Sequence, residues 1–279
     1  MIVEFPDNPT WIITTILPFL QVCDVSLDGR YLVVYAGDVV AESHTFYMDI
    51  GKSGAITRDN PIVNLFPEPG RHVFLGNDDN LFYFRTNFEA PNFKIISFDV
   101  EKNEWSNMIE ENPSAVIVWA KIVAGDKLVL CYNEHLDTRL EIHKLDDSGE
   151  LIKTIAFEDN ISPYDHYGRR DLPDLFLRVE SYLNPGILYR LYFEDDSVES
   201  EVYDKIEIPY YDPTSFTSEL VFYSNDDGTN IPMTLVYKNT TELDGSAPCI
   251  LYGYGGFGKT SLPYFDVRTS YLLKILMEW

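Results

Sequence analysis

Short apolar runs, rich in β-branched, aromatic and leucine residues and separated by polar turns, recur along the chain up to residue 208. Each copy begins at an acidic or glycine-bearing turn and holds two apolar runs joined by a polar loop. The first runs begin near Tyr31, Leu81, Leu128 and Leu175, at spacings of 50, 47 and 47 residues. Strong helical periodicity is absent throughout this part. The pattern therefore predicts a series of β-hairpins.

Hairpins that recur at a period near 50 residues are typical of the four-stranded blades of a β-propeller. An irregular β-sandwich with evenly spaced hairpins is the alternative interpretation. Propellers close with about 4–8 blades. The four repeats therefore form either a small closed ring or part of a larger one, and the pattern leaves both open.

The character of the sequence changes near residue 208. "IEIPYYDPTSFTSE" holds Pro209 and Pro213 and predicts a linker, and "LVFYSNDDGTNIPMTLVYK" predicts a β-hairpin. The run "CILYGY" (249–254) predicts a buried strand, which a glycine turn and a short helix in "SYLLKILMEW" (270–279) follow. This order favours the start of an α/β domain. We therefore expect a first domain over 1–208 and the beginning of a second over 209–279.

The net charge of the chain limits the classes of molecule that it is expected to bind. The formal net charge is −24, and so acidic a surface repels phosphate backbones and anionic lipid. We therefore expect neither nucleic acid nor a membrane surface as a partner. The apolar run at 11–23 is too short to span a bilayer, is interrupted by Pro18 and lacks the cationic start of a signal peptide.

The number and spacing of the cysteines indicate the cellular compartment of the protein. Cys23, Cys131 and Cys249 are scattered and odd in number, which fits reduced thiols in the cytoplasm better than a disulfide framework. No pair of them has the spacing of metal ligands. We expect no metal site.

The glycine-rich stretch "YGYGGFG" (252–258) is the strongest candidate for chemistry. Glycines after a buried strand let the backbone approach a ligand closely or adopt a positive φ. In α/β-hydrolases the loop after an early strand supplies part of the oxyanion hole, and a phenol O–H can donate there as a backbone N–H does. Loss of one such donor raises the barrier by about 3–4 kcal/mol. An aromatic-lined turn that serves only packing is the alternative.

The sequence resembles one family over nearly its whole length. "SNDDGTNIPMTLVYKNTTELDGSAPCILYGYGGFG" is similar to the opening of the peptidase domain of prolyl oligopeptidases, serine peptidases in which a β-propeller covers an α/β-hydrolase domain. "EFPDNPTW", "DGRYLVVY", "LFYFRTN", "LVLCYNE" and "LNPGILY" resemble segments of that propeller, in the family's order. The resemblance implies a mostly β fold: about four blades of a seven-bladed propeller, followed by the first strands of an α/β-hydrolase domain.

The resemblance also implies roles for three residues. Tyr254 would donate its hydroxyl to the oxyanion, and Phe257 would line the pocket for the substrate proline ring. Met48, in "FYMDI", would form a wall of an outer subsite, with ordinary packing inside a blade as the alternative. The implied activity is acyl transfer through serine that cleaves short proline-containing peptides on the carboxyl side of proline. No cofactor is implied, and the complete enzyme would be a monomer.

The catalytic set is incomplete in these residues. No G-x-S-x-G elbow follows Tyr254, and a serine without a base is a poor nucleophile. All five histidines precede the hydrolase-like segment: His44, His72, His135, His143 and His166. We therefore expect a fragment or incomplete gene model that is inactive and poorly soluble alone. A catalytically dead propeller that acts as a binding or regulatory protein is the alternative from a different class.

Overall fold

The structure is a computed structural model of the chain, and it is mostly β. The residues that it describes are 4–5, 8–12, 21–37, 42–51, 60–157, 161–256 and 260–276. Within them, helix is limited to α1 (Val267–Leu276) and a single 3-10 turn, Pro213–Ser215. Two compact units divide the chain, Met1–Ser114 and Ala115–Trp279, and each is described by itself.

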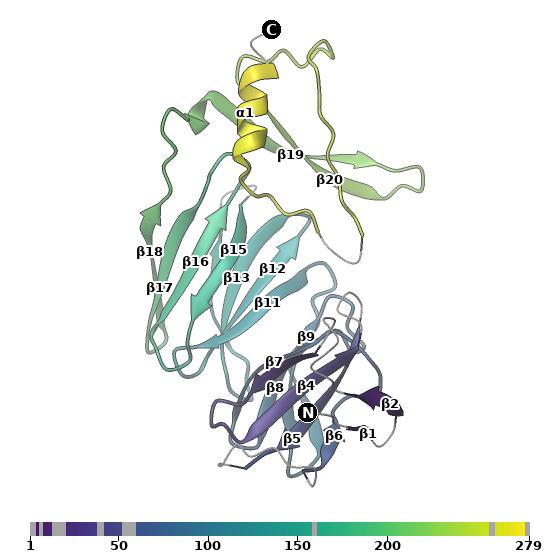
Figure 1. Cartoon of the computed structure of the whole chain (residues 1–279). Helices are drawn as coiled ribbons and strands as arrows, with labels where there is room; N and C mark the ends of the chain where they lie inside the picture. Colours follow the sequence, from purple (N-terminus) through teal and green to yellow (C-terminus); the bar gives the residue numbers. More distant parts are fainter. Residues whose placement is uncertain are drawn as a thin grey trace. The chain divides into compact units, whose positions relative to one another are not determined.

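The first unit holds two antiparallel four-stranded sheets and a two-stranded pair (Figure 1). The pair is β1 (Glu4–Phe5) with β2 (Asn8–Ile12). One sheet, in spatial order, is β3 (Gln21–Val25), β4 (Tyr31–Gly37), β5 (Ser43–Asp49) and β6 (Ile62–Asn64). The other runs from β7 (His72–Asp78) through β8 (Leu81–Thr86) and β9 (Lys94–Asp99) to β10 (Glu104–Ile109).

The second unit repeats this plan and adds a hairpin. Its first sheet is β11 (Val116–Val123), β12 (Lys127–Glu134), β13 (Asp137–Lys144) and β14 (Leu151–Ala156). Its second sheet is β15 (Ser162–Gly168), β16 (Asp174–Glu180), β17 (Ile187–Glu194) and β18 (Ser197–Lys205). β19 (Phe216–Ser224) and β20 (Asn230–Lys238) form the hairpin, and α1 follows it in the chain.

The predicted hairpins are confirmed. Tyr31 and Leu81 open β4 and β8, while Leu128 and Leu175 are the second residues of β12 and β16. Each predicted hairpin is the pair of second and third strands of a four-stranded sheet. One further strand flanks it on either side, and all neighbouring strands are antiparallel.

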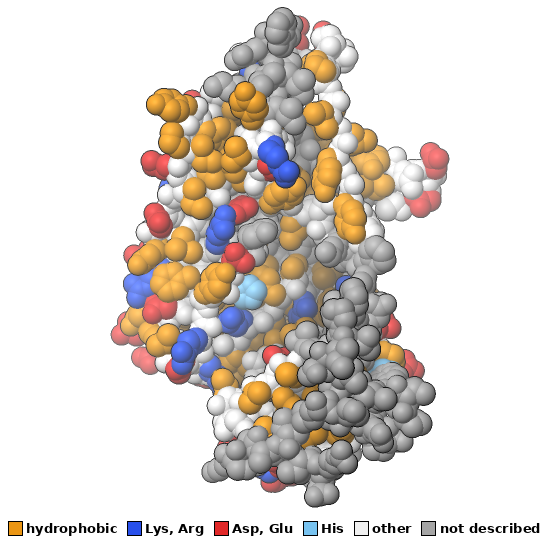
Figure 2. Space-filling model, in the orientation of Figure 1, with side chains coloured by type: hydrophobic (Ala, Val, Ile, Leu, Met, Phe, Trp, Pro, Cys, Tyr) orange, Lys and Arg blue, Asp and Glu red, His pale blue; other side chains and the backbone are white. Residues whose placement is uncertain are grey.

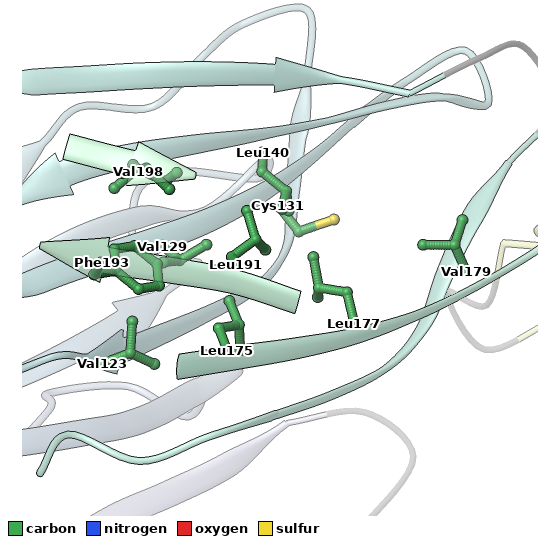
Figure 3. Packing of buried hydrophobic residues seen from close by; sticks show 11 residues of the cluster. Val123, Val129, Cys131, Leu140, Leu175, Leu177, Val179, Leu191, Phe193 and Val198 are labelled. Atoms are coloured by element: carbon green, nitrogen blue, oxygen red, sulfur yellow. The ribbon is translucent and has the colours of Figure 1, made fainter. Parts of the chain in front are cut away.

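The two sheets of the second unit share a core (Figure 3). Side chains from β12 and β13 meet those from β16 and β17, and Leu140, Leu175 and Leu177 are 0% exposed. Full burial of such a side chain contributes about 1.5–3 kcal/mol. The cluster comprises Val123, Val129, Cys131, Leu140, Ile142, Leu175, Leu177, Val179, Leu191, Phe193 and Val198.

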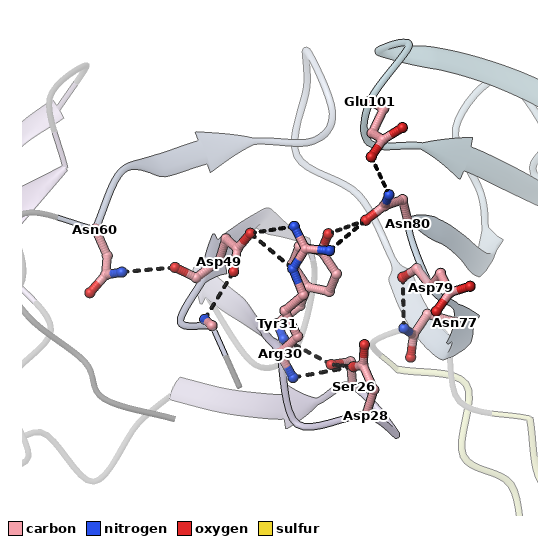
Figure 4. Close-up of polar contacts among 11 residues, drawn as sticks. Ser26, Asp28, Arg30, Tyr31, Asp49, Asn60, Asn77, Asp79, Asn80 and Glu101 are labelled. Carbon is pink, nitrogen blue, oxygen red and sulfur yellow. Dashed lines mark hydrogen bonds and ion pairs between the residues drawn. The ribbon is translucent and has the colours of Figure 1, made fainter. Parts of the chain in front are cut away.

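A polar network links the two sheets of the first unit at their turns (Figure 4). Arg30, just before β4, donates to Asp49 Oδ2 from Nε (3.1 Å) and Nη2 (2.9 Å), and to Asn80 Oδ1 from Nη1 (2.9 Å). The fully buried Tyr31 donates its hydroxyl to the same Asn80 oxygen at 2.5 Å. Asn80 lies in the turn between β7 and β8 and donates in turn to Glu101. The side-chain amide of Asn80 therefore joins the first sheet to the second by hydrogen bonds.

The segment after residue 208 partly follows the prediction. The hairpin is confirmed, and so is the helix, although α1 begins three residues before the predicted start and residues 277–279 lie outside the described residues. The buried strand predicted at 249–254 is wrong: these residues form an extended coil with exposed apolar side chains. A strand needs a neighbour to pair its backbone groups, and this segment lies outside every sheet of the described residues.

All three cysteines are free; Cys131 is buried, whereas Cys23 and Cys249 are exposed. In the described part of the chain, no helix combines the length and the apolar character that crossing a membrane requires.

Candidate functional site

Tyr254 lies in the glycine-rich coil at 249–256, and half of its side chain (50%) is exposed. Its backbone carbonyl accepts a hydrogen bond from the Ser261 hydroxyl at 3.0 Å, which ties the coil to the chain just beyond it. The phenol extends over Gly256, where an added Cβ would lie 3.5 Å from the hydroxyl oxygen. The phenol therefore lies at the surface beside the bare backbone of Gly256.

The glycines around Tyr254 matter because they have no side chains, and not because of their backbone conformation. A Cβ on Gly253 or Gly255 would meet nothing within 4 Å. None of the glycines 253, 255 and 256 has the positive φ that the turn glycine Gly228 adopts (φ 85°). The backbone conformation of this coil therefore does not require glycine. The missing side chains instead keep the surface beside the phenol open.

The fourth four-stranded sheet anchors the chain just after this coil. Phe265 donates its backbone N–H to Glu180 Oε2 at 3.3 Å, and Glu180, at the end of β16, is only 5% exposed. Arg178 Nη2 pairs with the other carboxylate oxygen, Oε1, at 2.5 Å. A buried carboxylate is tolerated when paired and hydrogen-bonded in this way. The prediction from sequence missed Glu180, because no motif marks a carboxylate that meets a backbone 85 residues away.

Tyrosines cluster around the same anchor. Tyr211 donates its hydroxyl to the carbonyl of Leu183 at 3.0 Å, and its ring meets Phe265 edge to face at 5.4 Å. Burial raises the pKa of Tyr182, and the nearby phenols of Tyr264 and Tyr252 act in the same direction. Figure 2 shows hydrophobic side chains gathered over this part of the second unit.

The other two predicted site residues lie elsewhere or outside the description. Phe257 lies outside the described residues. Met48 belongs to β5 of the first unit, pairs with Leu32 and Ile62 in the sheet register, and is 4% exposed. The described structure therefore presents Tyr254 alone of the three at a surface.

Four of the five histidines lie on strands, and His135 lies in the turn between β12 and β13. His72 Nδ1 is 2.7 Å from Thr86 Oγ1, and His143 Nδ1 is 2.9 Å from the carbonyl of Gly149. His166 stacks on Trp119. Among the described residues, no group of three or more His, Cys, Asp or Glu side chains is arranged to hold a metal ion.

Comparison with known proteins places the chain in a family. Residues 1–204 match the family model described as prolyl oligopeptidase, N-terminal β-propeller domain. Prolyl oligopeptidase ophP of Omphalotus olearius is 32% identical over 277 residues, which cover 98% of this chain and 36% of that protein. The prolyl endopeptidase of Elizabethkingia miricola is 28% identical over 250 residues, 87% of this chain and 33% of that protein.

Solved structures agree on the fold. Prolyl oligopeptidase B from Galerina marginata, bound to a 35mer hydrolysis and macrocyclization substrate, superposes with a TM-score of 0.84 at 23% identity. The superposition covers 96% of this chain and 37% of that one. The chain thus spans about a third of the length of the relatives that it matches.

Proposed function

This chain belongs to the prolyl oligopeptidase family, and we propose that it supplies the oxyanion-stabilising side of a serine endopeptidase that cleaves short peptides after proline. The observation that carries this proposal is the half-exposed phenol of Tyr254 on a glycine-lined coil. When a serine attacks a peptide carbonyl, the carbonyl oxygen gains negative charge, and a preorganised O–H donor stabilises it.

We propose the same division of the chain as the sequence predicts. Residues 1–208 would form part of the propeller, about four blades of seven, and 209–279 would begin an α/β-hydrolase domain. In support, β18 ends at Lys205 and β19 begins at Phe216, so a linker without strands separates the last four-stranded sheet from the hairpin. The three free cysteines favour the cytoplasm as the compartment.

We propose Phe257 as a substrate contact, and Met48 has less support for such a role. Phe257 would pack against the proline ring of the substrate, as the resemblance of "YGYGGF" to the motif of the family implies. Met48 would contact substrate only if its side chain left the sheet, and its 4% exposure favours the alternative of packing within the blade.

We further propose that these 279 residues do not hydrolyse peptides alone, because every histidine precedes the hydrolase-like segment. Without a base to accept its proton, Ser261 or Ser270 is a poor nucleophile. The same observation favours a second candidate function, a propeller protein that binds or regulates without catalysis. Incubation of the purified chain with a proline reporter peptide tests the proposed inactivity. Turnover that a serine-directed inhibitor blocks would refute that inactivity.

A chimaera tests the role of Tyr254 directly. Residues 1–279 would replace the matching part of the Omphalotus olearius prolyl oligopeptidase, and kcat would be measured on the reporter peptide. Tyr254→Phe should lower kcat by about 10²–10³-fold, whereas Tyr252→Phe, a neighbour that is 71% exposed, should leave it nearly unchanged. Equal kcat values for Tyr254→Phe and the unsubstituted chimaera would refute the oxyanion role.

A further inference from the structure

Glu180, the last residue of β16, uses both of its carboxylate oxygens although its side chain is almost fully buried. Oε1 pairs with Arg178 Nη2 at 2.5 Å, and Oε2 accepts the backbone N–H of Phe265 at 3.3 Å. Arg178 lies on the same strand, whereas Phe265 lies 85 residues further along the chain, just before α1. A single buried carboxylate thus joins the fourth four-stranded sheet to the segment that follows the glycine-rich coil.

The loop between β16 and β17 gives the same part of the chain further support. The hydroxyl of Ser181 accepts two backbone N–H groups of this loop, at 3.2 and 3.0 Å, which braces the loop from within. The phenols of Tyr252 and Tyr264 lie close enough to Tyr182 to help raise its pKa. One of these phenols precedes Tyr254 in the chain and the other follows it. The loop therefore lies close to the chain on both sides of Tyr254.

Only a short stretch of chain separates the Glu180 hydrogen bond from Tyr254. Phe265 follows Ser261 by four residues, and the Ser261 hydroxyl donates to the carbonyl of Tyr254 at 3.0 Å. Between these two positions Pro263 is buried, and its ring fixes the backbone φ at about −65°. The hydrogen bond at Phe265 therefore restrains the backbone of Tyr254 through a short and partly fixed segment.

Tyr254 needs such an anchor because strand pairing does not hold it. Residues 249–254 lie outside every sheet of the described residues, and Gly253 and Gly255 offer no side chains for packing. A donor stabilises an oxyanion from a distance of about 2.7–3.1 Å. Misplacement of a catalytic group by about 1 Å can cost about 10²-fold in rate. The position of the phenol therefore has to be set by contacts outside the coil.

We propose that Glu180 is a positioning residue for the oxyanion donor: its carboxylate fixes Phe265, and thereby the coil that carries Tyr254, against the end of β16. Glu180 is 5% exposed, so it acts on Tyr254 and not on the substrate. The role requires two acceptor oxygens, because Arg178 and Phe265 are both donors. A side-chain amide has one such oxygen and satisfies only one of them. That the anchored group serves catalysis rests on the proposed function of Tyr254; the anchor itself does not.

Glu180→Gln in the chimaera with the Omphalotus olearius prolyl oligopeptidase tests this role, because the substitution removes one acceptor and preserves the shape of the side chain. Titration with a serine-directed inhibitor counts the active enzyme, and kcat and KM are measured on the reporter peptide. We expect kcat to fall about tenfold, less than for Tyr254→Phe, while KM changes by less than about twofold. In the Tyr254→Phe background, Glu180→Gln should change kcat by less than about twofold.

Asp174→Asn is the matched control. Asp174 opens the same strand and pairs with Arg190 at 2.6 Å, so this change also removes a carboxylate from an ion pair, but at the other end of β16. It should leave kcat nearly unchanged. A residue that serves only folding affects both backgrounds alike, so an equal loss from Glu180→Gln in both overturns the proposal, as does no loss in either. The oxyanion role fails only if Tyr254→Phe itself leaves kcat unchanged, and the positioning role then fails with it.

The anchor can also be measured in the 279-residue chain without catalysis. Glu180→Leu removes both acceptor oxygens, so the backbone amide of Phe265 should exchange with deuterium about tenfold faster or more. Mass spectrometry of peptides that end on either side of residue 265 follows this exchange, and exchange within β12 should stay unchanged. Unchanged exchange at Phe265 overturns the anchor. Faster exchange in β12 as well overturns it too, because Glu180 would then stabilise the whole unit and not the segment beside the coil.

Discussion

The phenol oxygen of Tyr35 accepts a hydrogen bond from the backbone N–H of Phe74, 39 residues further along the chain, at 2.8 Å. Tyr35 lies on β4 and Phe74 on β7, so this bond joins the first sheet to the second. The same hydroxyl donates to Asp24 Oδ2 at 3.0 Å. Burial, together with the adjacent carboxylate, raises the pKa of Tyr35, which keeps the phenol protonated and able to donate.

Tyr35→Phe should therefore destabilise the first unit. The substitution keeps the ring but leaves the Phe74 N–H without its acceptor and Asp24 without its donor. We expect a loss of about 1–3 kcal/mol in the free energy of unfolding, measured by urea titration with circular dichroism. Tyr47→Phe is the matched control, because both tyrosine rings pack against the same cluster; a loss of the same size there would contradict this interpretation.

His72 should make the first unit sensitive to acid. Burial lowers its pKa from 6.5 to about 4, because the ring is stacked on Phe66 at 3.6 Å and is only 3% exposed. The unfolded chain binds the proton near pH 6.5 and the folded chain only near pH 4. The contribution of His72 is therefore fully present above pH 6.5 and is lost as the pH falls to 4, by up to about 3 kcal/mol.

A His72→Gln variant isolates this effect from the many carboxylates that titrate in the same range. The difference in unfolding free energy between the unsubstituted chain and the variant should shrink steadily from pH 7 to pH 4. A difference that stays constant over that range would show that His72 does not titrate in this way.

Leu177→Ala should weaken the second unit through a cavity in its core. Leu177 is 0% exposed and lies between the two sheets, so removal of its side chain should cost about 2.7–5 kcal/mol. Leu172→Ala, at a turn residue that is 48% exposed, should change stability by less than about 0.5 kcal/mol. Thermal unfolding of both variants checks this, and equal melting temperatures would contradict the packing described.

The inner hairpins of each sheet could be predicted from sequence because their residues are strongly apolar. The outer strands were harder: every residue of β14, "LIKTIA", is exposed or half-buried, so its alternation is weak. The buried strand expected at 249–254 failed for another reason. Apolar composition does not supply a neighbouring strand, and Leu251 is 83% exposed.

The candidate site was only partly accessible to prediction. Tyr254 is marked by its glycine-rich motif, and the structure places it at a surface. The Glu180 carboxylate on the Phe265 backbone and the stack of Trp119 on His166 join positions far apart in sequence. No local pattern encodes such pairs, because they arise only when segments far apart in the sequence pack together.

The free thiol of Cys131 lies in the core between the two sheets of the second unit, whereas Cys23 and Cys249 are open to solvent. An alkylating reagent will modify the two exposed sulfurs at once but will reach the third only when those sheets part. The delay before Cys131 is alkylated therefore measures how often the two sheets of the second unit separate.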